Sequence, residues 1–162
     1  MINFILIVVL AFNFNNSREF TTQTLLSKEN SLFMLEQTIE EQVKSNWDQP
    51  VYVLSALTAA IENLESLIDY KHLSKQDYEM LGKIKGHLLS TENSALTSYE
   101  EEGDLSKDDI WKLERLGDQL SLVGYENLIM EKSEKTNSKR DSKSKVINRY
   151  KQFLSTLEAP YE

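Results

Sequence analysis

Residues 54–68 read LSALTAAIENLESLI, and their apolar residues recur at alternating steps of three and four. This spacing places Leu54, Leu57, Ile61, Leu64 and Ile68 on one face of an α-helix, as in the seam of a left-handed helical bundle. An apolar seam of this kind needs other helices to cover it. The stretch therefore predicts a long amphipathic helix inside a bundle.

A short phrase marks where two further helices are expected to begin. It reads LSKQD at residues 73–77 and LSKDD at residues 105–109, which is 32 residues later. A serine at the N-cap accepts a hydrogen bond from a backbone amide, and a carboxylate three residues on favours the positive end of the helix dipole. A weaker copy lies at residues 137–141, and residues 26–29 resemble the first half. The recurrence reflects either duplication or convergent capping chemistry.

Helical spacing continues on both sides of this seam. Three more apolar stripes are formed by Leu32, Leu35, Ile39 and Val43; by Tyr78, Leu81, Ile84 and Leu88; and by Ile110, Leu113, Leu116, Leu120 and Val123. Asp48 is expected to cap the helix that contains residues 54–68, with Pro50 in its first turn. Five glycines and two prolines leave few breaks. These features predict an all-α antiparallel bundle of four to five helices, preceded by a short apolar N-terminal segment.

The N-terminal segment contains nine consecutive apolar residues, FILIVVLAF, from Phe4 to Phe12. A signal peptide has an apolar stretch of roughly 7–15 residues, whereas a transmembrane helix needs about 20. No Lys or Arg precedes the run, and no clear small-x-small cleavage site follows it. We expect residues 1–17 to be a signal peptide or short membrane anchor. The alternatives are a core segment and a misassigned start codon.

Acidic and basic residues are distributed unevenly along the rest of the chain. The net charge is −8, yet residues 18–130 hold 10 basic and 21 acidic residues, whereas residues 131–151 hold 8 basic and 3 acidic ones. An acidic body argues against general nucleic-acid binding, because phosphate contacts require a basic face. We expect an acidic helical bundle at 18–130, a charged flexible linker at 131–145 and a C-terminal amphipathic helix at 146–162.

This C-terminal helix is a candidate for partner binding. The stripe of residues expected to bind the partner consists of Val146, Ile147, Tyr150, Phe153, Leu154 and Leu157, and four basic residues accompany it: Lys143, Lys145, Arg149 and Lys151. An apolar stripe flanked by basic residues is typical of a helix that lies on a membrane surface or in a groove of a partner. The alternative is a fifth core helix whose basic residues face the acidic body.

An acidic turn at residues 98–109 (SYEEEGDLSKDD) aligns with the twelve-residue EF-hand calcium loop. Its glycine falls at position six, and Glu100, Glu102 and Asp109 fall at ligand positions. Ser98 replaces the usual first aspartate, and Asp109 replaces the bidentate glutamate at the end. The three carboxylates are candidate metal ligands, but a capped helix start after an acidic turn accounts for the same residues.

No catalytic motif is found in the sequence. There is no cysteine, and we find no nucleophile elbow, P-loop or dinucleotide fingerprint. Asp69 and His72 have the spacing of one half of a di-iron site, but no second half follows. Gly82 and Gly86 leave two bare patches on one helix face, which suit either partner docking or a marginal exposed segment.

The sequence thus predicts a non-enzymatic, exported or membrane-associated helical bundle that acts by protein–protein interaction. No cofactor and no nucleic acid are expected, and membrane association would run through Phe4–Phe12. The location would then be extracytoplasmic, secreted or membrane-anchored. The alternative is a cytoplasmic acidic regulator or immunity-type protein that neutralises a basic partner. A minor alternative is a degenerate EF-hand-like calcium binder.

Overall fold

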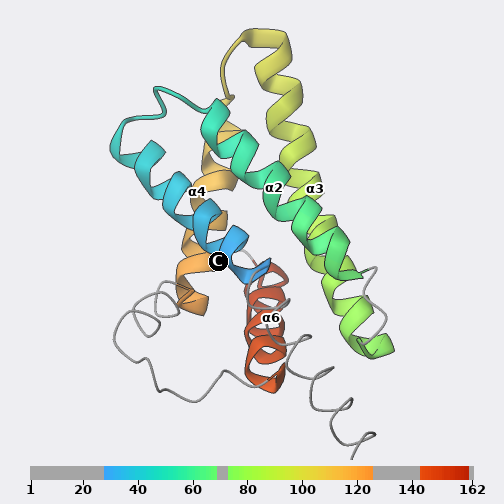
Figure 1. The fold of residues 1–162 in the computed structure, drawn as a ribbon. Coiled ribbons are helices and arrows are strands. Elements are labelled where there is room, and N and C mark those ends of the chain that lie inside the picture. The colour runs from blue at the N-terminus through green and yellow to red at the C-terminus, as the bar shows by residue number, and fades with distance from the viewer. Residues whose placement is uncertain (1–27, 69–72, 126–142, 161–162) are drawn as a thin grey trace, which may run out of the picture.

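The computed structural model describes residues 28–68, 73–125 and 143–160, and their regular structure is entirely helical. The helices are residues 28–44, α2 (Val51–Ile68), α3 (Lys75–Glu102), α4 (Lys107–Val123) and α6 (Lys143–Leu157). The predicted all-α bundle is confirmed (Figure 1). Phe4–Phe12 lies outside the described residues, so the signal peptide or anchor, and the location that it implies, stay predictions.

Two helices begin where the capping phrase predicts. The Ser74 hydroxyl accepts a hydrogen bond from the amide of Asp77, and the Asp77 carboxylate accepts one from the amide of Ser74, each at 3.2 Å. Ser106 caps α4 in the same way, by accepting from the amide of Asp109 at 3.2 Å. The weaker copy at residues 137–141 lies outside the described part of the chain.

Helix α3 runs unbroken for 28 residues and ends at Gly103. That glycine has a φ of 73°, in the left-handed region, and its amide donates to the carbonyl of Tyr99 at 2.9 Å. Glycine ends helices this way because it lacks the Cβ that penalises positive φ. The acidic stretch at 98–102 is therefore the last part of a helix, and only residues 103–106 form the turn to α4.

The helix with the heptad-like seam, α2, lies along α3 in the opposite direction (Figure 1). Its buried side chains are Val53, Leu54, Leu57, Ala60, Ile61, Leu64 and Leu67. Its length and apolar composition would also suit a membrane span. Here its seam lines the core, with Leu67 fully buried and Ile68 only partly buried at its end.

The connection between residues 28–44 and α2 differs from the prediction. The first helix ends at residue 44, and Val43, expected on the core stripe, is 47% exposed. Helix α2 begins at Val51, directly after Pro50, so Asp48 lies too early in the turn to be its N-cap. The first helix ends before this turn because Asn46 and Trp47 both have left-handed backbone conformations.

The φ angles of Asn46 and Trp47 are 57° and 61°. This conformation costs energy for residues with a Cβ, and here it reverses the chain so that the Trp47 indole is buried. The indole Nε1 donates to the Glu114 carboxylate on α4 at 3.2 Å. The end of the first helix is therefore set by the contact between Trp47 and Glu114. The apolar spacing that included Val43 does not determine it.

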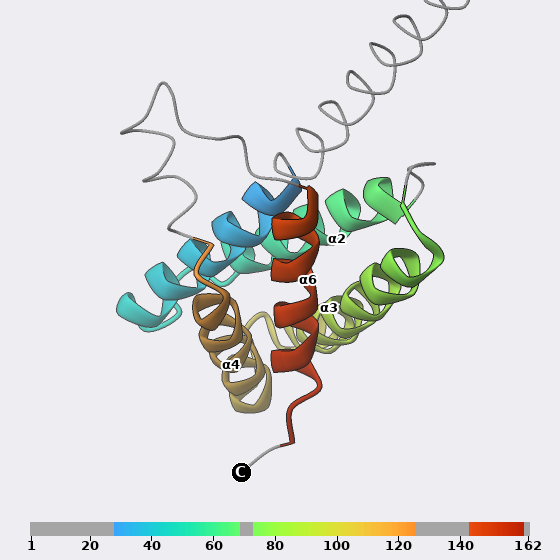
Figure 2. The same cartoon turned by 90° about the horizontal axis from the view of Figure 1, so that it is seen from below.

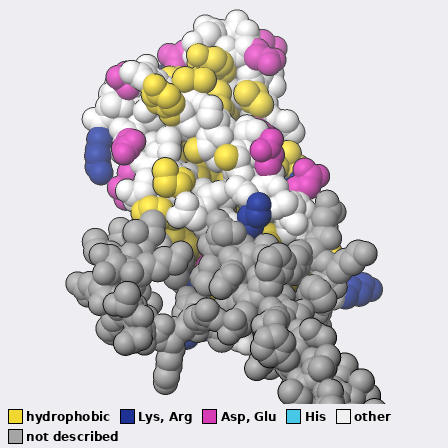
Figure 3. All heavy atoms as spheres, viewed as in Figure 1, with side chains coloured by type: hydrophobic (Ala, Val, Ile, Leu, Met, Phe, Trp, Pro, Cys, Tyr) yellow, Lys and Arg dark blue, Asp and Glu magenta, His cyan; other side chains and the backbone are white. Residues whose placement is uncertain are grey.

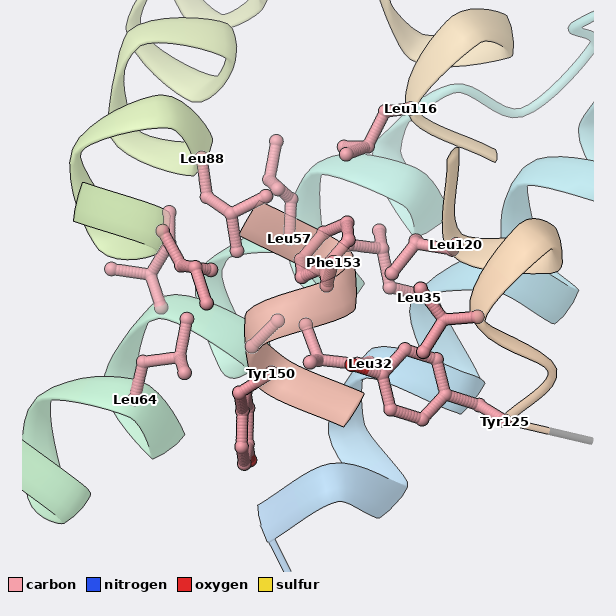
Figure 4. Close-up of a cluster of buried hydrophobic side chains, with 14 of the residues drawn as sticks. Leu32, Leu35, Leu57, Leu64, Leu88, Leu116, Leu120, Tyr125, Tyr150 and Phe153 are labelled. Atoms are coloured by element: carbon pink, nitrogen blue, oxygen red, sulfur yellow. The ribbon is translucent and has the colours of Figure 1, made fainter. Parts of the chain in front are cut away.

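Helix α6 completes the core between α3 and α4 (Figure 2). Val146, Tyr150 and Phe153 are fully buried, Ile147 is 6% exposed, and Leu154 and Leu157 are partly buried against the same cluster. Figure 4 shows Tyr150 and Phe153 among leucines from the other helices. The predicted partner-binding stripe is thus the inner face of the fifth bundle helix. Partner binding through it would require α6 to leave the bundle.

One close approach fixes the distance between the first helix and α4. A Cβ built on Gly117 would lie 2.8 Å from Cγ2 of Ile39 and 3.5 Å from its Cβ. Because the neighbour is a branched side chain close to its own backbone, it cannot simply rotate away. Gly82 and Gly86 differ, since a Cβ on either would meet nothing within 4 Å.

We expect Gly117→Ala to lower the free energy of unfolding by about 1–3 kcal/mol, because overpacking outweighs the helix propensity gained. Gly82→Ala is the matched control and should raise the free energy of unfolding by up to about 1 kcal/mol. Urea denaturation monitored by circular dichroism measures both. Equal or greater stability of Gly117→Ala relative to Gly82→Ala would contradict the close approach.

Candidate functional site

A surface groove of about 300 Å³ lies between α3 and α4, beside the end of α6. It exists because α3 and α4 are joined by a short turn and the last turn of α6 stops against both (Figure 2). Among its apolar lining residues, Leu157 is partly exposed, whereas Leu88 and Leu116 lie at the floor and are 0% and 3% exposed. Its other lining residues are His87, Ser90, Thr91 and Ser94 of α3, and Trp111, Lys112, Arg115 and Gln119 of α4.

Trp111 and Arg115 form the most distinctive pair in the groove. They are four residues apart on α4, so they lie on the same face, and the guanidinium carbon is 5.7 Å from the centroid of the indole ring. Trp111 is 50% exposed. Arg115 Nη2 also donates to the carbonyl of Ala159 at 3.4 Å, and Gln119 Nε2 donates to the carbonyl of Thr156 at 2.7 Å. The chain after Phe153 thus holds two groove side chains in place.

The groove is lined by basic but no acidic side chains, and the exposed Asp108 is paired with Lys112 beside it. Its eleven lining residues include Arg115, Lys112 and His87 but no Asp or Glu, although the whole sequence carries a net charge of −8. Lys112 Nζ lies 2.5 Å from Asp108 Oδ2 and donates to Ser94 Oγ at 3.2 Å. Lys112 is therefore already paired with a carboxylate at the edge of the groove.

Asp109, one of the candidate metal ligands, is buried beneath this groove. Its carboxylate accepts hydrogen bonds from Ser94 at 2.6 Å and from Ser98 and Ser106 at 2.5 Å. Burial raises the pKa of Asp109, but the hydrogen bonds from Ser106, Ser94 and Ser98 and the charge of Lys112 together hold this pKa below its ordinary value.

The three candidate metal ligands are not brought together. Glu100 and Glu102 are exposed at the end of α3, whereas Asp109 is buried and bonded to serines. Ser98 and Asp109, the first and last positions of the EF-hand alignment, are joined directly by a hydrogen bond. In the part of the chain that the structure describes, no group of three or more His, Cys, Asp or Glu residues could hold a metal ion.

Because the pKa of Asp109 is lowered in the folded state, the stability of the fold should depend on pH. Its ionised form stabilises the fold above the unfolded pKa of about 3.9, and this stability is lost as the pH falls through the lower folded pKa. Asp109→Asn should be about 1–3 kcal/mol less stable at pH 7, and its stability should fall less than that of the wild type below pH 4. Urea denaturation across pH 2–7 tests this, with the exposed Asp118→Asn as control. Parallel pH profiles for the wild type and Asp109→Asn would be inconsistent with this role.

A second polar cluster joins the two ends of the described chain. Arg149 of α6 donates from Nε and Nη2 to the two carboxylate oxygens of Glu29, at 2.9 and 2.7 Å. The Glu29 side chain is fully buried and that of Arg149 is 16% exposed. Burial, together with the nearby charge of Glu29, raises the pKa of Tyr125 and Tyr150 well above the ordinary value, so both phenols are neutral. No described residue accepts a hydrogen bond from either hydroxyl.

The Glu29 carboxylate in this cluster is closed to solvent, and we assign the cluster to the fold. Replacing Arg149 by Met should cost about 3 kcal/mol of stability, because it leaves a buried carboxylate without its cation. Lys151→Met, an exposed change on the same helix, is the control and should alter stability by less than about 0.5 kcal/mol. The measurement is urea denaturation at pH 7. Similar stabilities for the two variants would mean that the ion pair contributes little.

Among the described residues, large exposed apolar side chains also occur away from the groove. Met34 of the first helix and Val51 and Tyr52 of α2 are about half exposed. On the face built from these two helices, hydrophobic groups are separated by polar and acidic ones (Figure 3). Within the described part of the chain, the α3–α4 groove brings together a half-exposed tryptophan ring, the arginine beside it and the partly exposed Leu157.

In comparisons with protein families, curated proteins and solved structures, the chain matches none of them. The interpretation of the groove therefore follows from its geometry. Sequence reasoning did not single out Trp111, Lys112 or Arg115. A signal was present, because Trp111 lies off the apolar stripe of its helix and four residues before an arginine. Tryptophan is enriched among the residues that dominate binding at protein interfaces, so its place on the polar face of a helix marks a candidate contact surface.

Proposed function

We propose that this chain is a non-enzymatic helical-bundle protein that acts by binding a partner protein in the α3–α4 groove. The observation that carries the proposal is Trp111, which is half exposed and held beside the Arg115 guanidinium at the groove. Tryptophan and arginine are enriched among the residues that dominate binding energy at protein interfaces. Covering such a ring stabilises a complex by removing apolar area from water.

Two side chains of the groove are also held in place in the unbound protein. Arg115 contacts both Trp111 and the carbonyl of Ala159, and Gln119 contacts the carbonyl of Thr156. Side chains that are already held lose less conformational entropy on binding. A volume of about 300 Å³ is at the small end for ligand pockets, so it suits one or two side chains of a partner better than a large cofactor.

The alternative function, neutralising a basic partner, uses a different surface. Glu100, Glu101, Glu102 and Asp104 are exposed at the end of α3 and in the following turn. This surface would attract a basic protein through long-range charge. The two functions therefore predict different contact positions on the same helix pair, and one experiment can separate them.

The test is site-specific photo-crosslinking in the native cell. A photoreactive phenylalanine replaces Thr91 in the groove, Glu101 at the acidic end of α3 or, as control, the exposed Glu62 of α2. We expect an adduct with one defined protein from Thr91, identified by mass spectrometry. This adduct should be lost when Trp111→Ala is added, because the covering of the ring contributes to binding.

Two results would overturn the assignment of the groove. An adduct from Glu101 alone would support the acidic surface and a basic partner. Adducts of equal yield from Thr91 and Glu62 would indicate non-specific capture. Because half of Trp111 is buried and contacts Arg115, Trp111→Ala should lower the free energy of unfolding by about 1–2 kcal/mol while the chain stays folded, which circular dichroism checks.

A further inference from the structure

We infer that the face built by the first helix (residues 28–44) and α2 docks a basic amphipathic helix of a partner protein. This inference does not rest on the α3–α4 groove and adds a second contact surface. Among the described residues six large apolar side chains are exposed, and four of them lie between residues 34 and 52: Met34, Val43, Val51 and Tyr52. Apolar residues exposed singly need no explanation, whereas a group of them marks a contact surface.

Two hydrogen bonds show how the first helix and α2 lie side by side (Figure 1). Lys28 Nζ donates to Asn63 Oδ1 at 2.7 Å, and the amide of Gln49 donates to Gln42 Oε1 at 3.0 Å. Both bonds fit one antiparallel register, in which each step forward along the first helix matches one step back along α2. The relative height of residues on the two helices follows from this register.

The register brings the exposed Met34 and Tyr52 close together. An α-helix rises 1.5 Å per residue, so the two residues lie about 8 Å apart along the shared axis. Tyr52 and Asn63 are separated by close to three full turns and lie on the same side of α2, the side that contacts the first helix. Met34 and Tyr52 are both more than half exposed. One apolar surface therefore extends across the two helices.

Carboxylates lie at one end of this surface. Glu41 follows Met34 by two turns on the same side of the first helix, Asp48 lies in the turn to α2, and both are exposed. Glu40 is paired with Lys44 at 3.3 Å. No described residue forms an ion pair with Glu41 or Asp48. The charges of these two carboxylates are thus available to cations of a partner.

The surrounding charge favours a basic ligand. Residues 28–68 hold seven acidic and two basic residues, and Figure 3 shows acidic groups beside hydrophobic ones on this face. Both lysines are engaged, since Lys28 donates to Asn63 and Lys44 lies beside Glu40. Complementary charge speeds the encounter with a basic partner, and like charge disfavours an acidic one.

A helix is the form of ligand that matches the spacing on this face. Helical residues four apart lie about 6 Å apart on one side, close to the axial distance between Met34 and Tyr52. Apolar residues at i and i+4 would cover these two side chains, and Lys or Arg one turn further would reach Glu41 and Asp48. Glu62 lies about 8 Å beyond Met34 in the direction away from Glu41, so it is outside this surface.

The experiment uses the full chain, labelled with ¹³C at the methionine methyl groups. Met34 lies on the exposed surface and Met80 is buried in the core, so their methyl signals provide a probe and an internal control. Met34→Leu and Met80→Leu assign the two signals. The ligand is a synthetic peptide of about fifteen residues, because shorter helices are marginal in water. It carries two leucines four residues apart, followed one turn later by lysines, and is titrated at physiological salt.

We expect the peptide to move the Met34 signal and leave the Met80 signal unchanged. The double variant Glu41→Gln with Asp48→Asn should weaken the affinity at least about fivefold, because two charge-assisted contacts are lost. Both side chains are exposed, so the variant should keep the helicity of the wild type, which circular dichroism checks.

The matched control is the double variant Glu100→Gln with Glu102→Gln. It removes the same charge from the exposed end of α3, away from the proposed surface, and should change the affinity less than about twofold because distant charges are screened. Equal weakening by the two double variants would mean that the peptide responds to net charge alone, which contradicts the inference.

The remaining outcomes would also overturn the inference. One is an unmoved Met34 signal, and another is equal movement of the Met34 and Met80 signals. Equal binding of a peptide with Ser in place of its leucines, or Gln in place of its lysines, would mean that the surface does not recognise the combined pattern. Crosslinking from Thr91 in the α3–α4 groove is independent of these results. Failure of this docking surface can therefore be distinguished from failure of the proposed function.

Discussion

The ion pair between Glu29 and Arg149 is the contact on which the arrangement of the helices most depends. It joins the first described helix to the last one across 120 residues, with both carboxylate oxygens engaged and the glutamate fully buried. Leucines around it can pack in several registers, because dispersion is not directional. A bidentate pair with a fully buried carboxylate can form in one register, so it fixes where α6 lies along the bundle.

The elements that could be predicted from sequence are those that local chemistry determines. Ser74 and Ser106 cap their helices because the hydroxyl and its amide are three residues apart, and no distant contact is needed. The end of the first helix could not be found this way. It depends on positive φ at Asn46 and Trp47, which the contact between Trp47 and Glu114 on α4 maintains.

The difference between local patterns and distant contacts also explains what the structure shows for the candidate sites. The amphipathic pattern of Val146 to Leu157 correctly indicates a helix with one apolar face, but a pattern cannot say which surface covers that face, and in this structure it is the chain's own core. The groove requires α3, α4 and the end of α6 together, so spacing within one helix reveals only the pair Trp111 and Arg115.

Helix α6 connects the ion pair to the groove. Its middle supplies Arg149 to the buried pair, and its end supplies Leu157 and the carbonyl of Thr156 to the groove, Leu157 being eight residues or about 12 Å further along the axis. The position of the groove wall is therefore set by a contact about two turns away on the same helix. A ligand that touches Leu157 must, by linkage, stabilise the docking of α6, because it binds only the docked state. Weakening the ion pair would correspondingly reduce the fraction of molecules with a complete groove, without any change in the groove's own residues.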